Sequence, residues 1–193
     1  MRVRLREFAH SQFVFLAHVV SLILPGRQLP LFDADQLIPS DVSHWDTDEL
    51  TILIEEGRRQ SDRQHTDLQA LRGRAQWLFT VAVTALAALC TGLVSTKPNG
   101  LPAVLWVAGV IALVYGIGGA ASVMVARADL RSIHTAVLSS QRQPVNLALA
   151  QAYARMMSEG ENTFATRLTV FRQSVVWCLC GGYGGLLAAL MGT

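Results

Sequence analysis

Two long segments without a charged residue constrain this chain most. The first covers residues 75–95 and the second residues 101–126. At a helical rise of about 1.5 Å per residue, each is long enough to cross a hydrocarbon core of about 30 Å. The residues between them, TKPNG, favour a turn. The sequence therefore predicts a transmembrane helical hairpin over residues 75–126.

A third charge-free segment lies at residues 173–193. Its five glycines lower its helix propensity, so an interfacial or re-entrant segment is the alternative to a third transmembrane helix. The mean hydropathy of +0.35 and the 51% of hydrophobic residues are typical of a membrane protein. The predicted fold class is an all-α membrane protein, with a hairpin and a C-terminal third span.

The distribution of arginine predicts the orientation. The hairpin loop contains only Lys97, whereas arginines flank the hairpin on both sides. Cytoplasmic loops of membrane proteins are enriched in Arg and Lys, so both flanks are predicted to be cytoplasmic. Fifteen arginines against one lysine suggest a GC-rich bacterial genome. The expected location is the bacterial inner (cytoplasmic) membrane, with several spans and a cytoplasmic N-terminal stalk.

Residues 1–45 allow three interpretations. MRVRLR followed by FVFLAHVVSLIL resembles a secretory signal, but no small-x-small cleavage site follows. A second interpretation is a membrane-surface helix that displays Phe8, Phe15, Leu16, Val19 and Ile23. In the third, native translation begins at Val42 and residues 1–41 do not belong to the protein.

The stalk, residues 46–74, is predicted to be the start of the first transmembrane helix. Asp46 or Thr47 is the expected N-cap, and no proline follows before Pro98. One seam with alternating four-three spacing runs along this helix. It consists of Leu50, Ile54, Gly57, Ser61, Gln64, Leu68, Leu71, Ala75 and Leu78. Such a seam favours packing against a neighbouring helix of the same chain.

The predicted neighbour comes from residues 127–172. Residues 128–140 continue the second span, Pro144 interrupts the helix, and a further amphipathic helix follows. Its expected inward residues are Leu149, Ala152, Met156 and Phe164. Together with the stalk, these segments are predicted to form a small cytoplasmic helical bundle.

The sequence provides little that suggests catalysis. The pairs His44 with Asp46 and Asp62 with His65 are interpreted as exposed helix-face groups, and Cys178 and Cys180 as buried thiols. We therefore predict no enzymatic activity, no metal site and no cofactor.

The charge of +2, spread over scattered arginines, argues against nucleic-acid binding. The spans lack ionisable Asp, Glu, Lys, Arg and His, which argues against a coupled transporter but leaves an oligomeric pore open.

Small residues four apart predict close helix packing within the spans. The pairs are Ala88 with Gly92, Gly116 with Ala120, Gly118 with Ser122, Gly181 with Gly185, and Gly184 with Ala188. Contacts within one chain and contacts between chains are both compatible with these pairs. The predicted anchors at the membrane interface are Arg74, Trp77, Arg127, Arg172 and Trp177.

The order of the segments along the chain is similar to that of a known group of proteins. A polar helix with DRQHTDLQALRGRAQWLF leads into a span, a short loop, a second span and a helix that begins RADLRSIH. Over roughly residues 47–140, this order resembles small bacterial membrane effectors of the SLATT and Pycsar type. The resemblance implies a membrane part that assembles and disrupts the inner membrane when a nucleotide-signalling partner triggers it. The predicted third span and the lack of an evident ligand-binding domain distinguish this chain from those families.

The leading hypothesis is a non-enzymatic membrane protein that forms homo-oligomers through its spans and acts as a pore-forming or membrane-disrupting effector. Its expected partners are the lipid bilayer and other copies of the chain. The alternative is an accessory or scaffold subunit whose cytoplasmic helices bind a partner protein.

Overall fold

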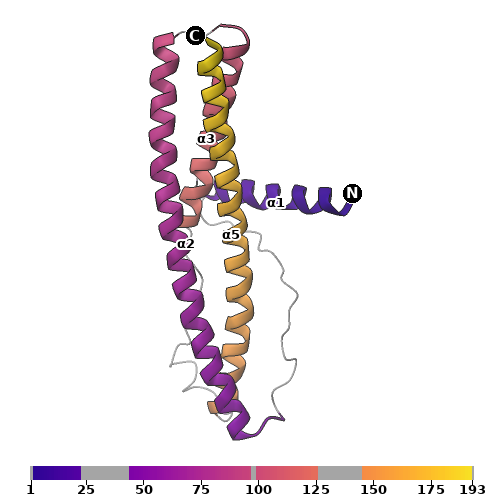
Figure 1. Ribbon diagram of the computed structural model, residues 1–193. Coiled ribbons are helices and arrows are strands. Elements are labelled where there is room, and N and C mark those ends of the chain that lie inside the picture. The colour runs from indigo at the N-terminus through magenta and orange to yellow at the C-terminus, as the bar shows by residue number, and fades with distance from the viewer. Residues whose placement is uncertain (1, 23–43, 97–98, 126–144, 193) are drawn as a thin grey trace. The chain divides into compact units, whose positions relative to one another are not determined.

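The computed structural model describes residues 2–22, 44–96, 99–125 and 145–192, and these are almost entirely helical (Figure 1). The helices are α1 (Arg2–Ser21), α2 (Thr47–Thr96), α3 (Leu101–Val125) and α5 (Val145–Gly192). The predicted helix at 128–140 and the predicted anchor Arg127 lie outside the described residues.

Helix α2 begins with a reciprocal capping box. The Asp46 carboxylate accepts a hydrogen bond from the Glu49 backbone N–H at 2.8 Å, and the Glu49 carboxylate accepts one from the Asp46 N–H at 3.0 Å. These two bonds satisfy backbone donors that the first turn of a helix leaves free. The predicted N-cap at Asp46 is confirmed.

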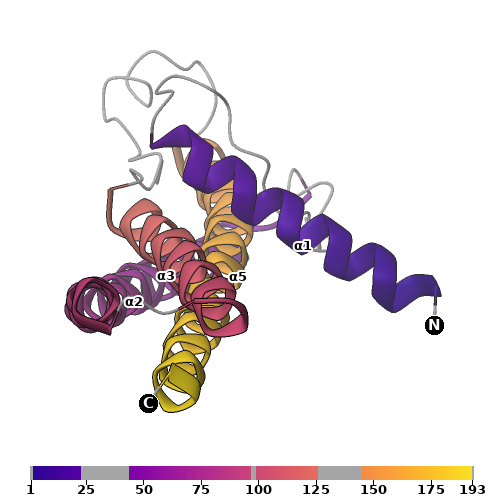
Figure 2. The ribbon, with the colours of Figure 1, turned by 90° about the horizontal axis from the view of Figure 1, so that it is seen from above.

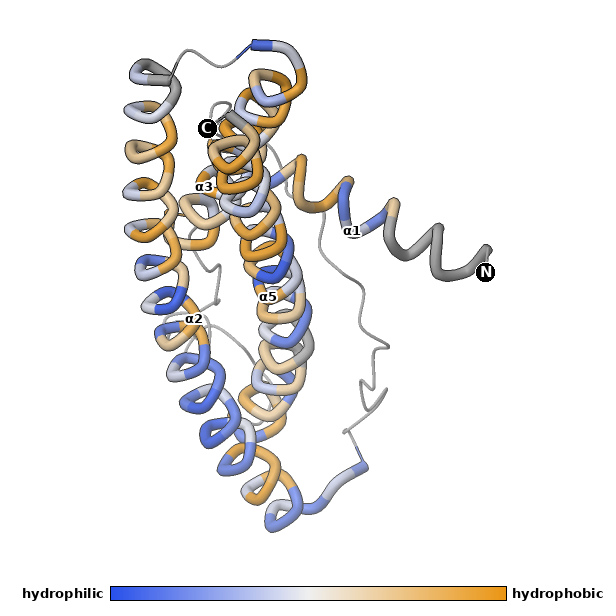
Figure 3. Tube along the Cα trace, turned by 45° about the horizontal axis from the view of Figure 1, so that its top comes forward, coloured by the Kyte–Doolittle hydropathy of each residue, from blue (hydrophilic) through white to orange (hydrophobic). Residues whose placement is uncertain are grey.

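Both long helices change from polar to apolar along their length (Figure 3). Helix α2 is continuous through the stalk and the first span, as predicted. Helix α5 starts directly after Pro144 and is one helix of 48 residues. The predicted amphipathic helix and the third apolar segment are therefore two parts of one helix, α5.

Three helices are long and apolar enough to cross a membrane. The stretches that qualify lie within Thr47–Gly92, Leu101–Val125 and Gly160–Met191. This confirms the predicted all-helical class with three candidate spans.

The chain divides into two compact units. The span unit contains residues 1–30, 71–126 and 167–193, and the stalk unit contains 31–70 and 127–166. The sequence of the span unit has nine Arg and Lys residues and one acidic residue, Glu7, for a formal charge of +8. The stalk unit has seven Arg residues and thirteen acidic residues, for a formal charge of −6. The chain is thus nearly neutral as a whole, but its positive charge is concentrated in the span unit and its negative charge in the stalk unit.

In the span unit, the hairpin of α2 and α3 turns at Gly100. Gly100 has a φ of +65°, which a residue with a Cβ rarely adopts, and its carbonyl accepts a hydrogen bond from Val104 N at 3.3 Å. Next to the turn, the buried Trp106 packs directly on Gly92 of α2. The close approach at Gly92 joins the two helices of the predicted hairpin.

Helix α1 crosses α3 steeply in the span unit (Figures 1 and 2). One of the interpretations of residues 1–45 has Phe15 facing the membrane, but Phe15 is fully buried, with its ring 5.0 Å from that of Tyr115 in an edge-to-face contact. On α5, Gln173 accepts a hydrogen bond from Gln12 at 2.8 Å. Packing against α3 and α5 explains why Phe15 is covered, whereas Leu16, which the same interpretation assigns to the membrane, is exposed.

The stalk unit is held by the polar parts of α2 and α5. Leu50 and Ala150 form a small apolar core with neighbouring Leu and Ile side chains. Farther along, Tyr153 packs on Gly57, and Gln64 donates a hydrogen bond to the Met157 carbonyl at 3.3 Å. The seam predicted along α2 is confirmed, because each of its residues is buried or half-buried.

The facing side of α5 differs slightly from the prediction. Leu149, Ala152, Met156 and Phe164 are only half-buried. The buried positions include smaller residues, namely Ala148, Ala150, Ala154 and Gly160. At Gly160 a side chain has no room, because a Cβ there would collide with the Gln64 side chain of α2.

Candidate functional site

In the span unit, helices α3 and α5 approach each other backbone to backbone. A Cβ placed on Gly181 would lie 2.7 Å from the Gly109 carbonyl oxygen, and one on Gly109 would lie 3.1 Å from Gly185 N. Such distances leave no room for a side chain. Van der Waals contact between the two backbones is the main packing force available to helices surrounded by lipid.

The contact between α3 and α5 continues at a second set of positions. A Cβ on Gly116 would lie 3.0 Å from the Ser174 carbonyl oxygen, and Gly119 faces the Ser174 side chain. The Ser174 hydroxyl donates a hydrogen bond to the Val170 carbonyl at 2.9 Å. The buried hydroxyl therefore has a partner within its own helix.

Most of the residues predicted to mediate helix packing lie at contacts within the chain. Gly116, Ala120, Ser122, Gly181 and Gly185 are all buried. Gly118 faces Val19 of α1, and Gly92 faces Trp106. Ala88 differs from the others because it is exposed. Of the packing residues predicted, Ala88 is the one that the single chain leaves open.

Ala88 belongs to an exposed face of α2 made of small side chains. Thr80, Thr84 and Thr91 lie on this face. Each threonine hydroxyl donates a hydrogen bond of 3.0 Å to the backbone carbonyl four residues earlier. This face, which we call the threonine face (Thr80, Thr84, Ala88 and Thr91), is therefore compatible with an apolar environment, because its polar atoms are already bonded.

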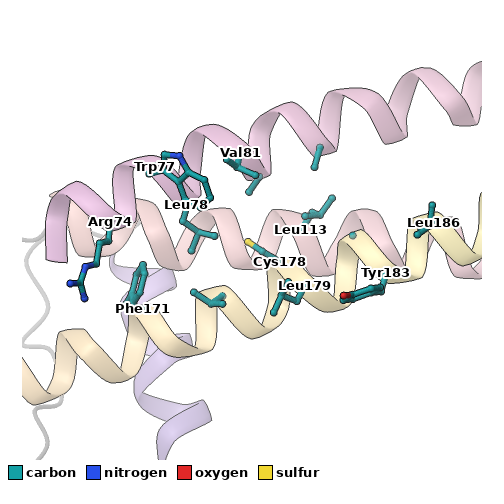
Figure 4. Close-up of a pocket in the computed structure, with 14 residues that line it drawn as sticks. Arg74, Trp77, Leu78, Val81, Leu113, Phe171, Cys178, Leu179, Tyr183 and Leu186 are labelled. Carbon is teal, nitrogen blue, oxygen red and sulfur yellow. The ribbon is translucent and has the colours of Figure 1, made fainter. Parts of the chain in front are cut away.

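A second feature of the span unit is a groove of about 680 Å³ between α2 and α5 (Figure 4). Arg74 and Phe171 lie at one end, and Leu186 lies at the other (Figure 4). The remaining lining residues are Trp77, Leu78, Val81, Ala82, Ala85, Leu113, Val175, Cys178, Leu179, Gly182 and Tyr183. The lining is apolar except at the Arg74 end and at the Tyr183 hydroxyl.

The predicted interface anchors differ in their surroundings. Arg74, Trp77 and Arg172 are exposed, and the first two line the groove. Trp177 instead packs edge-to-face on Tyr115, with ring centres 5.3 Å apart. Its Nε1 atom is buried and has no hydrogen-bond partner among the residues that the structure describes. The anchoring roles of these residues stay predictions.

Helix α1 contributes a buried imidazole. His18 Nδ1 lies 2.9 Å from the Val14 carbonyl oxygen. Because a carbonyl oxygen only accepts hydrogen bonds, Nδ1 carries the hydrogen. Burial lowers the pKa of His18, the Val14 carbonyl opposes that change, and the positive charge of Arg167 lowers the pKa further. His18 is therefore held neutral where α1 packs.

The groups considered for chemistry do not gather in one place. Asp62 and His65 are exposed on α2, Cys178 lies next to Gly116, and Cys180 is exposed. Within residues 2–22, 44–96, 99–125 and 145–192, no three His, Cys, Asp or Glu side chains are placed to hold a metal ion.

No protein-family model, curated protein or solved structure matches the chain. The resemblance to SLATT and Pycsar effectors therefore rests on the order and character of the sequence segments.

Sequence reasoning missed Gly109, Gly119 and the groove. Gly109 precedes Gly116 by seven residues, so the two share a helix face, and this spacing is a signal that could have found it. The groove has no such signal, because its walls come from α2 and α5, which are far apart in sequence.

Proposed function

We propose that this chain is a non-enzymatic, multi-pass protein of the bacterial inner membrane that assembles through its spans and permeabilises the membrane as a defence effector. The proposal is supported by the three candidate spans and by the resemblance of residues 47–140 to such effectors. The stalk unit, which carries the acidic charge, then lies in the cytoplasm and receives the signal.

The main support for this proposal is that the rest of the chain buries the three candidate spans to different extents. Only 11% of the apolar window of α2 is buried within the chain, compared with 28% for α3 and 28% for α5. The threonine face of α2 is part of this uncovered surface. Small residues allow a second backbone to approach closely, so this face is suited to a helix from another copy.

The glycines of α3 and α5 do not provide a good test of assembly, because they already pack within one chain. A better test replaces Ala88 with tryptophan and compares it with Val107→Trp, a change at an exposed position of α3. We expect A88W to reduce cross-linked oligomers and membrane depolarisation in expressing cells, and V107W to leave both unchanged. Polarised cells with the unmodified chain, or equal behaviour of the two variants, would contradict the proposal.

An accessory or scaffold subunit is the second candidate, and one feature of the stalk unit favours it. Ile52 is 68% exposed close to the Leu50 core, and Trp45 is also exposed. The stalk unit as a whole carries a charge of −6. An exposed apolar group on an acidic surface suits a basic protein partner.

This candidate predicts a stable one-to-one complex and no change in membrane potential. Ile52→Asp should remove the complex, whereas Thr51→Asp, at the neighbouring exposed position, should retain it. Depolarisation by the chain alone favours the effector instead.

A further inference from the structure

The groove between α2 and α5 begins at a charged residue and is at least as long as one bilayer leaflet is deep. Along α2 its lining extends from Arg74 to Ala85, a rise of about 16 Å, and along α5 from Phe171 to Leu186, a rise of about 22 Å. Half of a hydrocarbon core is about 15 Å thick. An acyl chain that enters beside Arg74 therefore has apolar walls over the depth of a whole leaflet.

The volume of the groove is that of a small-molecule site. The groove offers about 680 Å³, which is within the range of small-molecule sites. An extended hydrocarbon chain is narrower than a helix and matches the apolar walls.

The charge at the open end favours an anionic headgroup. Arg74 is exposed there, and Arg172 follows the lining residue Phe171 in the sequence. Glu7 is the only acidic residue in the sequence of the span unit, so the unit has a formal charge of +8. Arginine binds phosphate with several N–H donors, and basic residues at the membrane surface attract anionic lipids.

We propose that the groove between α2 and α5 binds an anionic glycerophospholipid, with one acyl chain between the helices and the phosphate at Arg74. This site shares no residue with the threonine face, and it is complete in a single chain. Its occupancy therefore does not depend on assembly or on membrane permeabilisation, and the two proposals can fail independently.

The first test compares headgroups on the purified full chain. Delipidated protein is titrated with phosphatidylglycerol and with phosphatidylcholine of identical acyl chains, and bound lipid is counted by native mass spectrometry. We expect phosphatidylglycerol to bind several-fold more tightly. Arg74→Gln should reduce this preference about fivefold, the effect of one arginine near an anionic lipid. Arg172→Gln, which removes an equal charge outside the lining, should reduce it less.

The second test fills the groove without disturbing the helix packing. Gly182 lines the groove, and a Cβ placed on it meets no atom within 4 Å. Gly182→Leu should therefore fold and reduce the binding of phosphatidylglycerol, whereas Gly182→Ala should retain most of it. Ala85→Leu fills the groove from α2 and provides a second variant if G182L is not monodisperse.

Four outcomes would overturn the proposal. Equal affinity for the two lipids would show that the site does not select an anionic headgroup. Unchanged binding by both G182L and A85L would show that the groove is not the site. Saturation by glycerol 3-phosphate at the same concentration as by phosphatidylglycerol would show that an anion alone is bound. Efficient disulfide dimers of Leu179→Cys, with the three native cysteines replaced, would place a second copy in the groove.

Discussion

Helices α2 and α5 pack against neighbours in both units, but by different means. In the span unit, α5 contacts α3 through bare backbone at Gly109 and Gly181. In the stalk unit, α2 and α5 meet through Leu50, Tyr153 and the amide of Gln64. The comparison shows that one helix can use two kinds of packing when its surroundings change along its length.

The solvent expected around each unit, water for the stalk unit and lipid for the candidate spans, explains this difference. Water drives Leu50 and Ala150 together, because burying apolar area removes it from water. Lipid provides no such drive between helices, so close van der Waals contact must hold the spans together. The charges follow the same division, at −6 for the stalk unit and +8 for the span unit.

Among the variants that test this comparison, Gly181→Leu is expected to lower the unfolding free energy most. The new side chain would collide with the Gly109 carbonyl and Leu113, neither of which is the end of a long flexible chain. Overpacking of this kind costs about 3 kcal/mol of unfolding free energy, at the upper end of measured values. Thermal unfolding in detergent measures the loss.

The control for G181L is Gly182→Leu, one residue along the same helix, where the added side chain enters open space. G182L should retain the melting temperature of the unmodified protein or raise it, because leucine favours a helix more than glycine does. Equal losses for the two variants would disprove close backbone packing as the stabilising contact.

A smaller effect is expected from Leu50→Ala in the stalk unit. Removing a buried leucine side chain costs about 2 to 3 kcal/mol, and here the cost should fall on the stalk unit. Amide hydrogen exchange of residues 47–70 should rise, while exchange of residues 101–125 stays unchanged. Ile52→Ala, at an exposed site, is the control and should change stability by less than about 0.5 kcal/mol. Equal exchange changes in both regions would argue against two separate units.

Asp46→Ala should cost about 1 kcal/mol of helix stability, because the Glu49 N–H loses its acceptor. Hydrogen exchange at the first turn of α2 measures the effect. Glu56→Ala removes only an exposed ion pair of 3.8 Å with Arg59 and should cost a few tenths of a kcal/mol. A larger loss from E56A than from D46A would contradict the role of the capping box.

The smallest effect at neutral pH concerns His18, whose buried imidazole should make the packing of α1 sensitive to acid. Its pKa in the folded protein is below the ordinary value of 6.5, so the unfolded segment binds more protons in that range. The contribution of the neutral imidazole is therefore complete above pH 6.5 and is lost as the pH falls below that value.

Hydrogen exchange of residues 9–21 between pH 7.5 and 5, corrected for the intrinsic rate, should show this loss, and His18→Asn should remove the pH dependence. The stalk unit serves as the reference, because its described histidines His44 and His65 are exposed. A pH response of α1 that persists in H18N would contradict the assignment.

Several features were predictable because local physics determines them. The lack of charge in 75–95 and 101–126 makes those helices long and apolar enough to cross a membrane. The four-three seam from Leu50 to Leu78 marks the face that α2 buries, and Asp46 marks where α2 begins. Each of these signals lies within one helix.

Other features depend on which helices meet. The interpretation of α1 as a membrane-surface helix does not fit Phe15, because Tyr115 and Gly119 lie against it. The sequence left open whether the small-residue pairs pack within one chain or between chains. In the tertiary structure, Gly116, Gly181 and Gly185 lie at contacts between helices of the same chain.

By itself, the sequence determined the helices, the candidate spans and the charge of each segment, because these follow from residue type and spacing along a single helix. Only the tertiary structure decided that Ala88 stays uncovered and that α2 and α5 enclose a groove beside Arg74. The physical reason is that a small residue allows close approach from any side, and only the arrangement of the helices decides which neighbour fills that space or leaves it open.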